Sequence, residues 1–69
     1  MSKYDKILHW SEEDAAWLVT VPDLPGCMAD GKTQEEALHN VEAIISEWIE
    51  TAKTDGVNVP LPRSSFQRA

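Results

Sequence analysis

Hydrophobic and polar residues alternate in two short stretches near the start of the chain. Residues 4–10 (YDKILHW) and 16–21 (AWLVTV) are rich in aromatic and β-branched side chains, and the polar sequence SEEDA lies between them. This pattern is typical of two strands joined by a hairpin loop. In the second stretch Trp17, Val19 and Val21 share one face, which we expect to face the core. The first stretch carries apolar side chains on both faces, so its inward face stays open.

Turn-forming residues follow the second predicted strand. Pro22 and Pro25 each fix φ and lack an N–H donor, and Gly26 can adopt the positive φ of a tight bend. The chain is therefore expected to reverse here and to return as a short third strand over residues 27–30 (CMAD).

Apolar residues then recur at three- and four-residue steps, which predicts one long helix. Thr33 and Glu36 form a T-x-x-E capping box at its start, and Gly56 is placed to end it in the left-handed conformation. The apolar stripe consists of Ala37, Leu38, Val41, Ile44, Ile45, Trp48, Ile49 and Ala52.

Residues 57–62 (VNVPLP) alternate again, but their two prolines cannot donate to a central ladder, so an edge strand is predicted. The predicted order is β-β-β-α-β. This is an α+β fold in which a small, mostly antiparallel sheet carries one amphipathic helix on one face. We expect a single domain over residues 1–62 and a flexible C-terminal tail over residues 63–69.

Composition restricts the partners and the compartment. The 69 residues include one cysteine, which cannot form an internal disulfide, and no signal peptide or membrane span is evident, so we expect a cytoplasmic protein. Twelve acidic residues against six basic ones give a net charge of -6. This charge opposes direct binding to nucleic acid and favours a basic protein partner.

Acidic residues near the expected strand ends and helix start are candidates for the metal site of a nuclease. Asp23, Asp30, Glu35 and Glu36 could converge on a hard cation. Each also has a local explanation, because turns favour Asp and the first turn of a helix favours acids. We expect no metal site and no cofactor.

The cysteine and the two histidines are candidates for a nucleophile and its base. Cys27, His9 and His39 fall on three different predicted elements with no triad spacing. Packing is the favoured role for Cys27, and we expect no catalytic residue.

Exposure and charge single out a different group of residues as candidates for binding a partner. A tryptophan at a strand end beside an acidic loop combines an aromatic contact with a charged rim. The candidate contacts are Trp10, Glu12, Glu13, Asp14, Asp23 and Asp30.

Four segments together resemble the HicB family of antitoxins: WSEED, VPDLPGC, ADGKTQEEALxN and WIETAKxxGxxxPxP. The resemblance extends from Tyr4 to Pro62. It implies a β-β-β-α-β domain similar to a partial RNase H fold, which binds and blocks the small HicA toxin. That toxin is an mRNA-cleaving ribonuclease with a double-stranded-RNA-binding-like fold and a catalytic histidine. Longer members carry a DNA-binding domain, which the short stretch after Pro62 does not resemble.

The leading hypothesis is a non-enzymatic antitoxin of a type II toxin-antitoxin system that neutralises a HicA-like ribonuclease by direct binding. The alternative is a stand-alone homo-oligomeric module, regulatory or ligand-binding, in which the free sheet face pairs with its own copy as a homo-dimer or homo-tetramer. A third reading, a metal-dependent nuclease, predicts cleavage of RNA that depends on Mg²⁺ or Mn²⁺, and we expect none.

Overall fold

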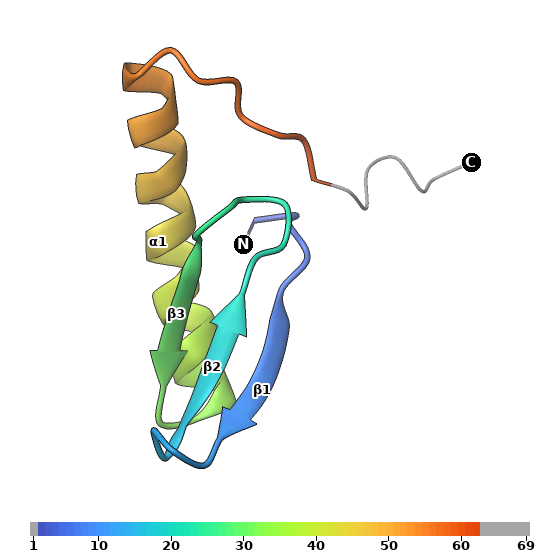
Figure 1. Cartoon of the computed structure of the whole chain (residues 1–69), viewed down its shortest axis with the longest axis vertical. Helices are drawn as coiled ribbons and strands as arrows, with labels where there is room; N and C mark the ends of the chain where they lie inside the picture. Colours follow the sequence, from blue (N-terminus) through green and yellow to red (C-terminus); the bar gives the residue numbers. More distant parts are fainter. Residues whose placement is uncertain (1, 63–69) are drawn as a thin grey trace, which may run out of the picture.

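The computed structural model describes residues 2–62, which form a three-stranded sheet and one helix (Figure 1). Strands β1 (Ile7–Ser11), β2 (Ala16–Thr20) and β3 (Met28–Gly31) pair antiparallel in the order β1-β2-β3. Helix α1 (Gln34–Thr54) packs on β2 and β3, on one face of the sheet. The predicted α+β class and the order of the first four elements are confirmed.

The register decides which face of β1 points inward. Val19 of β2 is fully buried and lies between Leu8 of β1 and Ala29 of β3, so these three side chains face α1. Because side chains alternate along a strand, the pair Trp10 and Trp17 also lies on this side. The question that the sequence left open for the first strand is thereby answered.

The core is formed by apolar side chains from the sheet, the loop and the helix. Gly31 lies where α1 comes very close to the sheet, since a Cβ atom there would stand 2.4 Å from the backbone nitrogen of Ala37. The buried cluster consists of Tyr4, Val19, Val21, Leu24, Cys27, Ala37, Val41 and Ile45.

The loop between β2 and β3 is a tight reversal, as predicted. The amide of Val21 donates to the carbonyl of Cys27 at 3.0 Å, and Gly26 has a φ of 79°. Leu24 is fully buried, so the loop closes one end of the core. The indole Nε1 of Trp48 donates to the carbonyl of Pro25 at 2.9 Å and ties this loop to α1.

Both ends of α1 are capped by the predicted residues. The hydroxyl of Thr33 accepts from the amide of Glu36 at 3.0 Å, and the carboxylate of Glu36 reaches back to the amide of Lys32 at 2.7 Å. Gly56 has a φ of 74°, the left-handed conformation expected after a helix.

The predicted fourth strand over residues 57–62 is wrong, because no strand forms there in the described chain. The prolines remove two ladder donors, and the segment is held instead by a side chain: the hydroxyl of Tyr4 donates to the carbonyl of Pro60. Val57 and Leu61 are 54% and 64% exposed. The predicted tail, 63–69, lies outside the described residues. No helix in the described part is long and apolar enough to cross a membrane.

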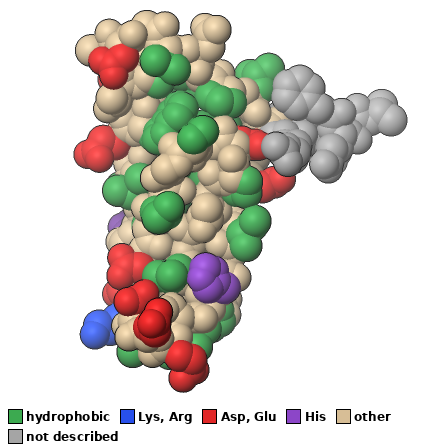
Figure 2. Space-filling model, viewed as in Figure 1, with side chains coloured by type: hydrophobic (Ala, Val, Ile, Leu, Met, Phe, Trp, Pro, Cys, Tyr) green, Lys and Arg blue, Asp and Glu red, His purple; other side chains and the backbone are tan. Residues whose placement is uncertain are grey.

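The sheet face opposite α1 has no covering element among the described residues. Ile7 and Met28 are 55% and 59% exposed on it, with Thr20 between them in register. In the next row on the same face, two positions along each strand, His9 and Asp30 flank Leu18. Figure 2 views the molecule from this side and shows hydrophobic side chains scattered over the sheet.

Candidate partner-binding surface

The hairpin between β1 and β2 presents an ordered aromatic pair. The rings of Trp10 and Trp17 meet edge to face, with centroids 5.7 Å apart and an interplanar angle of 67°. The indole Nε1 of Trp10 donates to the Glu12 carboxylate at 2.8 Å, which fixes the ring although its side chain is 43% exposed. β1 is the outer strand farther from α1 (Figure 1), which is consistent with the exposure of Trp10, whereas Trp17 on β2 is partly buried.

The loop of the hairpin is held by its own polar groups. The hydroxyl of Ser11 donates to the Asp14 carboxylate at 3.0 Å and accepts from the Asp14 amide at 3.2 Å. Ala15 completes the turn with a φ of 51°, a backbone conformation that residues other than glycine seldom adopt. Glu12 and Glu13 are exposed at the tip.

Asp30 lies at the same end of the sheet as this hairpin. Asp14 and Asp30 both line a hollow of about 300 Å³ between the hairpin and the start of α1. The carbonyl of Asp30 accepts from the side-chain amide of Asn40 at 2.8 Å, and its side chain is on the open face. Acidic side chains gather at this lower end of the molecule in Figure 2.

Asp23 lies elsewhere, in the loop of residues 21–27 at the opposite end of the sheet. It is half-buried, and its charge acts on Tyr4: burial first, and then the negative charge of Asp23, raise the pKa of the Tyr4 phenol. The structure thus brings together five of the six candidate contacts and separates the sixth. We call the group Trp10, Glu12, Glu13, Asp14 and Asp30 the hairpin cluster.

Cys27, His9 and His39 do not form a catalytic group. Cys27 is buried in the core, and burial raises the pKa of its thiol, which disfavours the nucleophilic thiolate. His9 is on the open sheet face, whereas His39 is on α1. Among residues 2–62, no three His, Cys, Asp or Glu side chains are placed to hold a metal ion together.

Two features were not foreseen from the sequence. The first is an ion pair that fastens the N-terminal arm to α1: the Lys6 ammonium lies 3.1 Å from the Glu42 carboxylate. That carboxylate also accepts from the amide of Ser2 at 2.9 Å. A Lys and a Glu that lie 36 positions apart give no local signal of such a contact.

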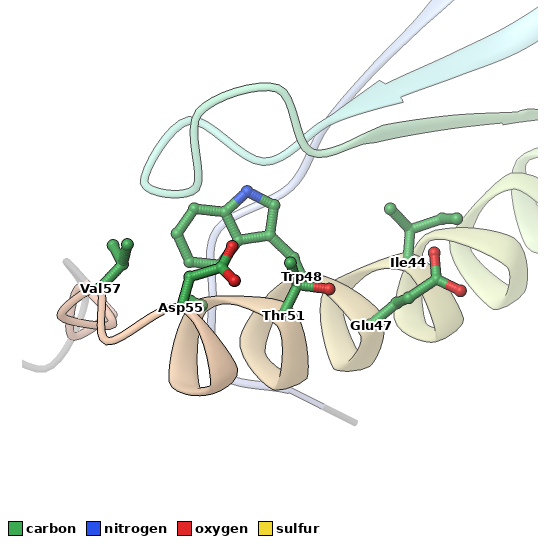
Figure 3. Close-up of a pocket in the computed structure, with 7 residues that line it drawn as sticks. Ile44, Glu47, Trp48, Thr51, Asp55 and Val57 are labelled. Atoms are coloured by element: carbon green, nitrogen blue, oxygen red, sulfur yellow. The ribbon is translucent and has the colours of Figure 1, made fainter.

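The second unforeseen feature is a groove beside the C-terminal half of α1, with a volume of about 360 Å³ (Figure 3). The spacing of the helix stripe placed Trp48 in the core, and its ring is indeed half-buried. The side chains that line the groove belong to Ile44, Glu47, Trp48, Thr51, Ala52, Asp55 and Val57.

The sequence comparisons identify the family of this chain. The model of the family described as "HicB_like antitoxin of bacterial toxin-antitoxin system" matches residues 4–68. The chain belongs to the HicB-like antitoxin family.

Two relatives of this HicB-like chain extend the match. UPF0150 protein Ta0767 of Thermoplasma acidophilum is 41% identical over 58 residues, which cover 84% of this chain and 83% of the relative. UPF0150 protein ssl0259 of Synechocystis sp. is 34% identical over 47 residues, covering 68% of this chain and 64% of the relative. No solved structure matches the chain.

Proposed function

We propose that this HicB-like chain neutralises a HicA-like, mRNA-cleaving ribonuclease by binding to it directly. Membership of the antitoxin family supports a toxin as the kind of partner. The observation that carries the proposal further is the hairpin cluster, in which an exposed tryptophan, fixed by Glu12, lies at the same end of the sheet as three further carboxylates.

Each part of the hairpin cluster suits such a partner. A protein that cleaves RNA needs a basic surface to hold phosphates, and acids steer a basic surface into contact. The Trp10–Trp17 pair supplies the aromatic anchor, since tryptophans are enriched among the residues that dominate binding energy. In this proposal the chain acts in the cytoplasm by occupying the toxin, without catalysis, without a cofactor and without contacting nucleic acid.

The test is co-production with a small, basic HicA-like protein, sought in the reading frames next to this one. We expect the native chain to restore growth and to co-purify with that protein. The triple variant W10A/E12Q/E13Q should lose most of the binding. The variant D5N/E50Q removes the same charge at exposed positions away from the hairpin and should bind normally. Persistent growth arrest with the native chain, or equal loss in both variants, would contradict the proposal.

We also propose that the open sheet face pairs with a second copy. A two-fold axis parallel to β2 would place Ile7 of one copy against Met28 of the other, and His9 against Asp30, because these pairs occupy the same rows on either side of β2. Such an axis sets an apolar side chain against an apolar one and an imidazole against a carboxylate. This assembly is compatible with toxin binding.

Light scattering after size exclusion tests this pairing. We expect the native chain to show a mass that rises with concentration toward a dimer, and Met28→Lys to remain a monomer. Leu61→Lys introduces the same charge at a similarly exposed position off the sheet and should leave the dimer intact. A native chain that stays monomeric at millimolar concentration would overturn the pairing without affecting the proposed toxin binding.

A further inference from the structure

The groove beside Trp48 is preformed by hydrogen bonds on both of its sides. On one side, the indole Nε1 of Trp48 is bonded to the carbonyl of Pro25, which prevents the ring from rotating. On the other side, the amide of Gly56 donates to the carbonyl of Lys53 at 3.2 Å, and the amide of Val57 donates to that of Ala52 at 2.8 Å. This pair of bonds is a Schellman motif.

The Schellman turn brings the apolar side chain of Val57 into the lining of the groove, together with the Trp48 ring. It folds Val57 back beside Ala52, and Val57 remains 54% exposed at the mouth of the groove. Trp48 and Ile44 supply the rest of the apolar lining. A side chain that enters the groove can therefore bury apolar surface without first ordering the protein, which lowers the entropic cost of binding.

The rim of the groove is acidic. Figure 3 shows the Asp55 carboxylate beside the Trp48 indole and the Glu47 carboxylate further along α1, near Ile44. Within residues 2–62, neither carboxylate is engaged in a hydrogen bond or an ion pair. Both residues are exposed, and Thr51 between them carries no charge.

Asp55 stands where a helix disfavours negative charge. It is the C-cap of α1, at the end where the helix dipole is negative, and Lys53 is the basic residue of the last turn. An acid at this position opposes helix stability, so the helix itself does not explain it. A cation bound beside Asp55 would be favoured by the carboxylate and by the dipole together.

We propose that this groove binds a basic, amphipathic segment of a protein partner. An apolar side chain of that segment rests on Trp48, and two Lys or Arg side chains reach Glu47 and Asp55. These acids are eight positions apart on the helix, so the two basic groups must be separated by roughly 12 Å. That distance corresponds to two turns of a helix in the partner.

The charges favour this occupant over others. A second copy of the chain carries a net charge of -6 and would be repelled by the rim. A single metal ion cannot bridge two carboxylates that start two helical turns apart. The groove lies at the opposite end of α1 from the hairpin cluster, so this proposal does not depend on the toxin proposal.

The experiment uses two synthetic helical peptides and NMR of the full chain labelled with ¹⁵N. One peptide carries two lysines two helical turns apart with leucines between them, and the other has glutamate in place of each lysine. We expect the basic peptide to shift the Trp48 indole signal and the amide signals of residues 44–57. The acidic peptide should leave these signals unchanged.

Variants assign the binding to the rim. E47Q/D55N should lower the affinity for the basic peptide about tenfold. Added salt should lower the affinity of the native chain by a similar factor. D5N/E35Q removes the same charge at exposed positions outside both the groove and the hairpin cluster, and should change the affinity less than twofold. Equal weakening in both variants, or shifts centred on the hairpin, would overturn the proposal.

The chain's own basic residues after Pro62 are excluded by a further variant. Arg63 and Arg68 both lie in that stretch. A chain that ends at residue 62 is compared with the full chain for the NMR signals of the groove residues and for its affinity for the peptide. Shifted groove signals together with much tighter binding of the peptide would mean that the removed stretch itself occupies the groove, and the proposal would fail. Unchanged affinity supports a separate partner.

Discussion

Gly31 shows how a single residue sets the distance between the two layers. Its φ is one that any residue can adopt, so the backbone conformation does not require glycine here. The backbone of α1 lies against it, however, and the Ala37 nitrogen and the Glu36 carbonyl carbon are both closer than 3 Å to where a Cβ atom would stand. Flexible side chains can yield to such a contact, but backbone atoms cannot. The resemblance to the antitoxin family included this glycine in the motif ADGKT, and the structure supplies its reason.

Gly31→Ala should therefore destabilise the fold by about 3 kcal/mol, the upper end of the range for overpacking. Urea unfolding followed by circular dichroism measures this. Gly26→Ala is the control, because a Cβ atom there meets nothing within 4 Å and only the left-handed φ is strained. That strain should cost about 1 kcal/mol. A smaller cost for Gly31→Ala than for Gly26→Ala would contradict the steric explanation.

Glu42 makes the stability of the fold depend on pH. Partial burial raises the pKa of its carboxyl, but the bonds from Ser2 and Lys6 and the positive charge of Lys6 outweigh burial and hold the pKa below its ordinary value. A pKa lower in the folded state than in the unfolded state adds stability above the unfolded value, about 4.3 for Glu. This stability is lost as the pH falls through the folded value.

We expect the free energy of unfolding to decline between about pH 5 and pH 3, and Glu42→Gln to flatten part of that decline. Urea titrations at a series of pH values supply the measurement. Glu50→Gln changes an exposed acid on the same helix and should leave the slope unaltered. The same slope for native chain and Glu42→Gln would show that this ion pair does not contribute.

At the scale of elements, the helix was predicted well and the last strand was not, for a physical reason. Capping is local: Thr33 and Glu36 bond within one turn, so the sequence alone reveals the start of α1. A strand exists only beside another strand. Residues 57–62 alternate as a strand should, but their donors are depleted by proline, and Tyr4 holds Pro60 through one hydrogen bond instead of a ladder.

Thr33→Ala tests the cap. Loss of the bond to the Glu36 amide should cost about 1 kcal/mol in urea unfolding. Hydrogen exchange should speed up first in residues 34–37, because fraying starts where the cap is missing. Thr54→Ala removes a hydroxyl that bonds only the Glu50 carbonyl within the helix, and should cost less. Equal costs would mean that the capping box does not fix the start of α1.

At the scale of the whole molecule, the sequence identified the hairpin cluster better than the groove. Five of the six predicted contacts gather at one end because a hairpin necessarily brings its loop and its flanking residues together. Asp23 lies at the other end because successive loops of an antiparallel sheet alternate between its two ends. The groove needed both the loop at Pro25 and the turn at Gly56, which only the folded chain brings together.

Charge at this scale predicts how salt affects binding to the proposed toxin. Raising ionic strength from 0.05 M to 0.5 M should slow association by about tenfold or more and change dissociation little, because exposed acids steer the encounter. Stopped-flow tryptophan fluorescence follows the encounter. The variant E12Q/E13Q should associate more slowly and respond less to salt. An association rate that is independent of salt would argue against steering by the hairpin cluster.

Asn40 bears on how the molecule avoids uncontrolled polymerisation. Its amide occupies a main-chain acceptor of β3, an outer strand, at Asp30. An outer strand with all its acceptors free is a template on which further chains can stack into fibres. The β3 border is thus partly blocked from within, which makes it a poorer starting point for amyloid-like filaments.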